Sequence, residues 1–108
     1  LHDGHLCRLS LESVSELVAQ SEIDFRTLKA NVLAVLEQRS QASIADVLEQ
    51  FPAAQGLGSV VGLLALGSRH GFKADHSETV GWVGGDDERR SARIPKIFFL
   101  RERANELV

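Results

Sequence analysis

The chain contains no methionine and a single cysteine, Cys7. Because translation starts with methionine, we expect the chain to be a domain of a longer protein. One cysteine cannot form a disulfide bond within the chain, which favours a reducing, cytoplasmic location. The longest uncharged aliphatic stretch, residues 53–68, is glycine-rich and shorter than the ~20 residues that a membrane span needs. The start of the chain shows no signal-peptide pattern, so the sequence predicts no membrane association.

Positive charge is also scarce, since the net charge is −3. Residues 1–68 carry 4 basic and 8 acidic side chains, and residues 69–108 carry 8 and 7. Nucleic-acid affinity depends largely on neutralising phosphates, so this balance lowers the expectation of strong DNA binding but allows a local basic patch. The hydrophobic content of 44% is ordinary for a folded protein, and 108 residues suffice for one domain with one core.

Helical periodicity and capping residues predict four helices. These helices are expected over residues 11–20 after Ser10, 25–38 after Asp24, 43–51 from Ser43, and 57–69 before Gly71. Asp46 can complete a capping box with Ser43, and Pro52 is expected to end the third helix.

After Gly71 the pattern changes from helical to extended. Strands are expected over residues 72–74, 79–83 and 89–94, with glycine and aspartate turn residues between the last two. Pro95 is expected to interrupt the last strand or to start a new element. The tail, residues 97–108, fits both a strand and a helix, and the sequence does not separate these two readings.

This order of elements is that of a winged helix-turn-helix domain preceded by one extra helix. We therefore expect an α+β fold. Residues 1–22 would form a linker and the N-terminal helix, and residues 23–108 would form the winged-helix domain.

The helix expected over residues 57–69 occupies the position of a recognition helix but carries one cation, Arg69. Recognition helices present polar or basic side chains to base edges, so we do not expect this helix to read DNA. A helical wheel instead puts an apolar face outward, which could bind a partner protein. The candidate partner-binding residues on this face are Gly58, Gly62, Leu63 and Leu66. The alternative is that residues 1–20 or 97–108 bury this face within the chain.

The expected wing contains the best candidates for DNA binding. These candidate residues are Arg89, Arg90, Arg93 and Lys96. Wings often contact DNA phosphates, which favours this interpretation. However, Asp86, Asp87 and Glu88 precede the cations and favour a solvated hairpin of mixed charge.

No arrangement of residues predicts catalysis. The sequence places no histidine beside the serines, and Gly56-Leu57-Gly58 lacks the lysine and the strand-to-helix context of a nucleotide-binding loop. His2, His5 and Cys7 are residue types that bind zinc, but their spacing matches no common structural zinc pattern. We therefore predict a protein that is not an enzyme and uses no cofactor or metal.

Four stretches of the sequence resemble a known family. They read IDFRTLKANV, RSQASIADVLEQFP, QGLGSVVGLLAL and RRSARIPKIFFL. They resemble the C-terminal portion of a long uncharacterised bacterial family, the kleisin-like subunit of the condensin-related plasmid-defence system Wadjet. The resemblance runs from about Ile23 to Arg101. It implies a winged-helix domain that docks on the head of an SMC-type ATPase, through apolar surfaces, while the partner hydrolyses ATP.

We therefore expect a non-catalytic winged-helix protein-interaction domain in a DNA-handling or plasmid-defence complex. Its protein partner would be an SMC-type ATPase, and it would contact DNA indirectly or weakly through the wing. The alternative is a DNA-binding winged-helix transcriptional regulator that uses the wing arginines.

Overall fold

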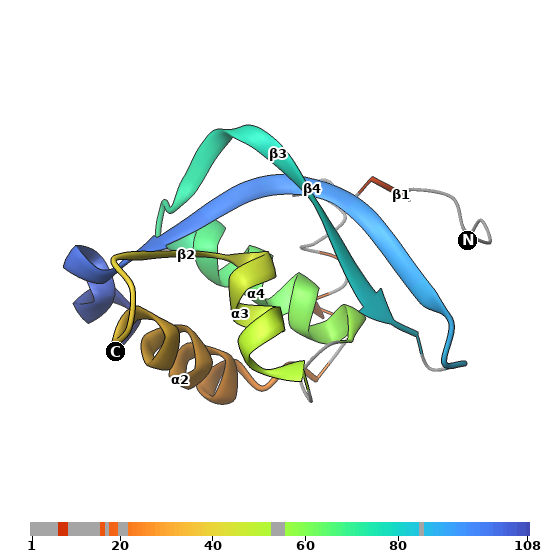
Figure 1. The fold of residues 1–108 in the computed structure, drawn as a ribbon, viewed down its shortest axis with the longest axis horizontal. Coiled ribbons are helices and arrows are strands. Elements are labelled where there is room, and N and C mark those ends of the chain that lie inside the picture. The colour runs from red at the N-terminus through yellow and green to blue at the C-terminus, as the bar shows by residue number, and fades with distance from the viewer. Residues whose placement is uncertain (1–6, 9–15, 17, 20–21, 53–55, 85) are drawn as a thin grey trace.

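The computed structural model describes residues 7–8, 16, 18–19, 22–52, 56–84 and 86–108. Within them the chain has the expected mixed α+β fold, in which helices pack against a long twisted hairpin (Figure 1). Of the helix expected over residues 11–20, residues 16, 18 and 19 are helical and the others lie outside the described residues. In chain order the elements are β1 (Cys7–Arg8), α2 (Phe25–Leu36), β2 (Gln41–Ser43), α3 (Ile44–Gln50), α4 (Leu57–Arg69), β3 (Lys73–Val83), β4 (Arg89–Leu100) and the 3₁₀ helix η2 (Arg101–Leu107).

The start of α2 confirms the predicted cap. The Asp24 carboxylate accepts hydrogen bonds from the Thr27 backbone N–H at 3.1 Å and from the Thr27 hydroxyl at 2.6 Å. These bonds satisfy a donor that the first turn of a helix otherwise leaves free. The helix then buries one face, which consists of Leu28, Val32, Val35 and Leu36.

The capping box predicted at the start of α3 is also confirmed. The Ser43 hydroxyl accepts from the Asp46 backbone N–H at 3.1 Å, and the Asp46 carboxylate accepts from the Ser43 N–H at 3.0 Å. Ser43 is also the last residue of β2, so this reciprocal pair fixes the point at which strand becomes helix.

α4 has the predicted bounds, Leu57–Arg69, and Gly71 closes its C-terminal end as expected. Gly71 adopts a left-handed conformation, with φ of 72°, which glycine adopts without steric cost. The Phe72 N–H donates to the Gly67 carbonyl at 2.8 Å and the Gly71 N–H donates to the Ser68 carbonyl at 3.2 Å. This pair of bonds is the Schellman motif, and it turns the chain from α4 into β3.

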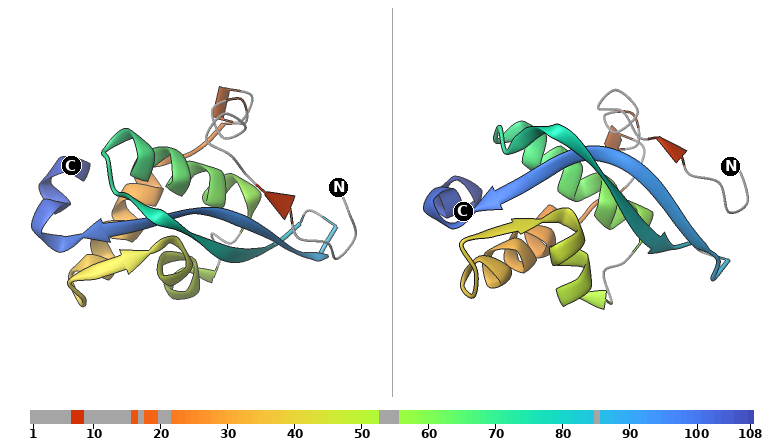
Figure 2. Two further views of the ribbon diagram at one scale, coloured as in Figure 1. Left: turned by 90° about the horizontal axis from the view of Figure 1, so that it is seen from above. Right: turned by 45° about the horizontal axis from the view of Figure 1, so that its top comes forward.

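β4 is the central strand of the sheet. β3 pairs with it antiparallel, from Val83 opposite Arg89 to Lys73 opposite Ile97. β2 pairs antiparallel with residues 98–100, and β1 pairs parallel with residues 92–93. Figure 2 shows β3 and β4 twisting around each other along the molecule, with η2 at one end and the hairpin turn at the other.

The hydrogen-bonding phase of the hairpin explains why Pro95 does not interrupt β4. The Gly84 N–H donates to the Glu88 carbonyl at 2.8 Å, which makes this the first hydrogen-bonded pair. Because such pairs alternate with non-hydrogen-bonded pairs, Pro95 and its partner Ser77 fall in a non-hydrogen-bonded pair. The missing N–H of Pro95 would therefore point away from β3, and its absence leaves the β3–β4 ladder intact.

One further expectation is corrected, and the structure decides the fold of the tail, which the sequence left open. One strand, β3, covers residues 73–83, where two short strands were expected. The residues between the two expected strands are part of β3, and the pairing of β3 with β4 shifts register between Lys73 and Ser77. The tail contains both of the predicted structures in succession, because β4 continues to Leu100 and η2 follows at once.

Candidate functional site at the start of α4

The apolar face of α4 that was expected to point outward lies inside the domain. Leu63 and Leu66 are both 0% exposed, and Gly62 is buried. α4 contacts α2, α3, β3 and β4, so neighbours surround most of its circumference. The expectation of an exposed patch at these three residues is therefore wrong. The face is buried within the chain, but the residues that cover Gly62 are Ile23 and Leu28, which lie outside the ranges 1–20 and 97–108 of the alternative.

Two glycines allow the neighbours to approach α4 closely. A Cβ atom on Gly62 would lie 2.8 Å from Ile23 Cγ2 and closer still to Leu28 Cδ1. On Gly67, a Cβ atom would collide with Ile97. The start of α2 and a residue of β4 therefore cover the face that the helical wheel had left open.

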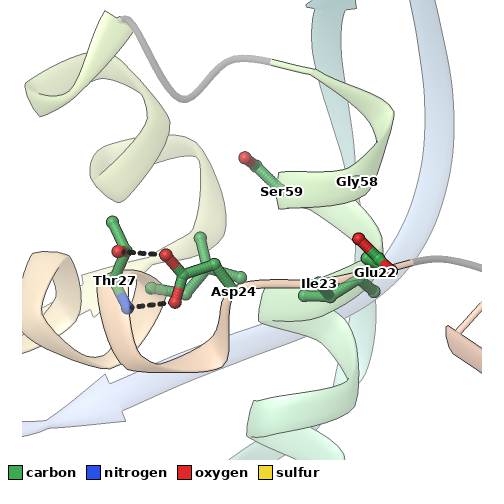
Figure 3. A pocket seen from close by; sticks show the side chains of 7 residues that line it. Glu22, Ile23, Asp24, Thr27, Gly58 and Ser59 are labelled. Carbon is green, nitrogen blue, oxygen red and sulfur yellow. Dashed lines mark hydrogen bonds between the residues drawn. The ribbon is translucent and has the colours of Figure 1, made fainter.

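Gly58 is the predicted partner-binding residue that the structure leaves exposed. A Cβ atom on Gly58 would have no heavy atom within 4 Å, so the space in front of it is open. A pocket of about 220 Å³ lies here, between the first turns of α2 and α4 (Figure 3). We call it the α2–α4 pocket, and it is lined by Glu22, Ile23, Asp24, Thr27, Leu28, Gly58 and Ser59.

The α2–α4 pocket has an apolar base and a polar rim. Ile23 and Leu28 pack against Gly62 below it, while Glu22 is exposed at its edge. The Thr27 hydroxyl, with the Thr27 backbone N–H, holds the pKa of Asp24 below its ordinary value. Asp24 is therefore ionised at neutral pH. The positive ends of α2 and α4 offset part of this negative charge.

The chemistry of the α2–α4 pocket suits binding. Both Asp24 oxygens accept hydrogen bonds from Thr27, so this carboxylate serves as a helix cap. The lining contains no histidine, cysteine or lysine that could act as a nucleophile or as a base near neutral pH. The prediction that the protein is not an enzyme stays a prediction.

Within the described part of the chain, no three His, Cys, Asp or Glu side chains gather to hold a metal ion. His2 and His5 lie outside the described residues, and β1 gives only the backbone position of Cys7. The prediction that the protein uses no metal is therefore untested.

At the tip of the β3–β4 hairpin, which was the expected wing, one predicted DNA-binding cation is paired with an acid. Arg90 Nη2 lies 2.7 Å from Asp86 Oδ2. The backbone N–H of Glu88 donates to Asp86 Oδ1 at 3.2 Å and lowers the pKa of the Asp86 carboxyl. This local neutralisation agrees with the interpretation of the wing as a mixed-charge hairpin.

The other three candidate cations of the β3–β4 hairpin do not converge on one point. Arg93 Nε donates to the Ser77 hydroxyl at 3.0 Å, and Lys96 Nζ lies 4.9 Å from the centre of the Phe98 ring. Arg89 is exposed, and four residues of strand, about 13 Å, separate it from Arg93. The hairpin therefore carries separate cations and no clustered basic patch among these residues.

Glu78 is a half-buried acid that the sequence did not single out. It lies on β3 opposite Ile94, and its Oε2 atom is buried without a hydrogen-bond partner among the described residues. Burial raises the pKa of Glu78, although the positive charge of Lys96 lowers it in part. Asp46 also raises it, while backbone N–H groups of Ile97 and Ala45 lower it.

Two arginines in η2 were also missed, because their partners are distant in sequence. Arg101 Nε donates to the Leu36 carbonyl at 2.7 Å, at the end of α2. Arg103 Nη2 donates to the His70 carbonyl at 2.6 Å, and its guanidinium lies 4.2 Å from the centre of the Phe72 ring. These bonds attach η2 to the ends of α2 and α4. A second hollow of about 510 Å³ lies beside them, lined by Leu33, Leu36, Glu37, Arg101 and Ala104.

The chain was compared with known protein families. Residues 3–99 match the family described as "Protein of unknown function (DUF3375)". The chain belongs to this family. DUF3375 carries no described function, so the link to a kleisin-like subunit continues to depend on the resemblance of the four sequence stretches.

No curated protein and no solved structure matches this DUF3375 domain. Among the helices of the described ranges, none combines the length and the apolar character needed to cross a membrane.

Proposed function

We propose that the chain is a non-catalytic winged-helix domain whose function is to bind another protein. The order α2, β2, α3, α4, β3, β4 supports the winged-helix assignment, because it is helix, short strand, helix, helix and hairpin. The pairing of both β2 and β3 with β4 is compatible with the same fold.

The burial of α4 is the observation that carries this proposal. A helix that reads the major groove must expose several polar side chains to base edges. Here Leu63 and Leu66 are core residues. The single cation of the helix, Arg69, stacks on the Phe25 ring, with its Cζ atom 5.2 Å from the ring centre. The face of α4 that holds Leu63 and Leu66 therefore supports the fold, and recognition is left to other surfaces, including the first turn of α4.

The α2–α4 pocket is the docking surface that we propose. Protein interfaces combine an apolar centre with a polar rim. Ile23 and Leu28 supply the apolar part, and Glu22 and Ser59 supply polar groups around it. Gly58 keeps the entrance open, so an apolar side chain of the partner can reach the base.

The resemblance to the Wadjet kleisin-like subunit supports a finer proposal about the partner. In this proposal the domain docks on the head of an SMC-type ATPase in a DNA-handling or plasmid-defence complex. ATP binding and hydrolysis then belong to the partner, and the wing contacts DNA weakly.

The test fills the α2–α4 pocket and measures binding to a purified SMC-type ATPase head by calorimetry. Gly58→Leu places a side chain in open space, so the fold is retained and the affinity falls about tenfold or more, which corresponds to ~1.4 kcal/mol. Gly58→Ala binds nearly as the unmodified chain, and Ala30→Leu, on an exposed part of α2, serves as the matched control. Unchanged affinity of Gly58→Leu rules out the pocket as the docking surface, and absence of any binding rules out this partner.

The alternative function, a DNA-binding regulator, is supported by Arg89 and Arg93. Arg89 is exposed, and neither arginine has an ion pair within the described residues. The Arg90–Asp86 pair weakens this alternative, because it removes one of the four candidate cations.

A further inference from the structure

β3 has a long edge that pairs with no strand among the described residues. Its partner is β4, and its eleven residues leave the opposite edge open. Proteins usually protect such edges with irregularities or inward-pointing charges, because a free edge invites pairing with another strand. The first half of β3 has these protections, namely the irregularity before Ser77 and the half-buried Glu78.

The second half of β3, Thr79 to Val83, has none of these protections. The segment reads TVGWV and contains no charge, no proline and no register shift. Its β-branched and aromatic residues are those that favour strands. Val83 is 36% exposed, and among the described residues it is one of two large apolar side chains at the surface.

The hydrogen-bonding phase of the hairpin aims the backbone of this segment outward. Gly84 and Glu88 form a hydrogen-bonded pair, so the pairs of Thr79, Gly81 and Val83 with β4 are non-hydrogen-bonded. The N–H and C=O groups of these three residues therefore point away from β4, toward the open edge. They form a regular row of donors and acceptors for an added strand.

We propose that the Thr79–Val83 edge is an interface between two copies of this chain, joined by antiparallel pairing of their β3 strands with Gly81 on the two-fold axis. In this register Thr79 of one copy lies opposite Val83 of the second copy, and Val80 lies opposite Trp82. Three outward-facing pairs supply about six backbone hydrogen bonds. The two hairpins then form one continuous sheet with an isologous interface.

A second copy fits this edge because the segment is self-complementary. It is uncharged, so no like charges meet across the axis. The exposed cations Arg89 and Arg93 lie on β4. In the dimer the two β4 strands are three strand spacings apart, about 14 Å, which exceeds the screening length of about 8 Å at physiological salt. This inference does not depend on the proposed function.

Sedimentation equilibrium of the 108-residue chain over a range of concentrations tests the proposal. Two variants of Gly81, one with alanine and one with proline, form a matched pair. Gly81→Ala keeps the N–H, and its Cβ would meet the Arg90 carbonyl at an ordinary 3.5 Å. Gly81→Pro removes an N–H that points outward, so it blocks the added strand and leaves the β3–β4 ladder intact. The double variant Thr79→Glu with Val83→Glu places carboxylates opposite Arg93 and Arg89 within one chain, but opposite each other across the axis.

We expect the unmodified chain and Gly81→Ala to show a twofold increase in mass as concentration rises. Gly81→Pro and the double glutamate variant should stay monomeric, with unchanged far-ultraviolet circular dichroism and Trp82 fluorescence. Amide exchange at Thr79, Gly81 and Val83 should slow in the dimer. A monomer at every concentration overturns the proposal, as does a dimer that persists in both edge variants. Edge amides that slow only when an ATPase head is added would assign the edge to that partner and also overturn it.

Discussion

Replacing Leu63 or Leu66 by alanine should strongly destabilise the protein, since both side chains are fully buried. Each change removes the equivalent of three methylene groups, which contributes ~2.4 kcal/mol at about 0.8 kcal/mol each. The cavity left behind raises the expected loss to about 2.7–5 kcal/mol for each variant. A domain of this size has a free energy of unfolding of about 5–15 kcal/mol, so the double variant Leu63→Asp with Leu66→Asp should not fold.

Urea unfolding measures these losses, with the fluorescence of Trp82 as the probe. Trp82 is the single tryptophan and is 4% exposed, so its emission reports on loss of the core. Gly58→Ala is the matched control on the same helix, and it should not lower stability because its Cβ enters open space. Losses below about 0.5 kcal/mol for both leucine variants are typical of surface positions and would refute the assignment of this face to the core.

Three other predictions concern the caps, the buried acid and the wing. Ser43→Ala removes the bond that the Asp46 backbone N–H donates to the Ser43 hydroxyl and should cost about 1 kcal/mol of stability, measured by urea unfolding. Glu78 binds its proton more tightly in the folded state, because burial raises its pKa, so the stability of the protein rises as pH falls through that raised pKa. Glu78→Gln should therefore be more stable than the unmodified chain at about pH 7, and the difference should vanish by about pH 4; a constant difference across this range would contradict the role of its charge. The chain should give only a weak band shift with DNA at low salt, and strong retardation that disappears in Arg89→Glu with Arg93→Glu would favour the regulator.

The sequence predicted those elements whose signals are local. Asp24, Ser43 and Gly71 lie within a few residues of the helix ends that they define, so α2, α3 and α4 could be placed from capping and periodicity alone. The hairpin turn was predicted for the same reason, since its glycines and aspartates are adjacent in the chain.

The features that the sequence left open depend on contacts between distant residues. Ile23 packs against Gly62 and Ile97 packs against Gly67 on α4, and these two isoleucines are 74 positions apart in the chain. The tolerance of β4 for Pro95 depends on the phase of hydrogen bonds set at Gly84. Of the predicted partner-binding residues, Gly58 is the one left at the surface. It lines the α2–α4 pocket, and the sequence did not reveal this pocket because it forms only where the first turns of α2 and α4 meet.

The position of Leu63 and Leu66 relative to solvent is the central claim of this account. Methyl NMR of the intact chain with a soluble paramagnetic agent measures it directly. The account predicts that both leucine methyl signals are as protected as those of Leu64, which is 0% exposed, while those of Val108, 93% exposed, broaden strongly. Broadening of the Leu63 and Leu66 methyl signals to the level of Val108 would show that α4 presents its apolar face to solvent and would contradict the account.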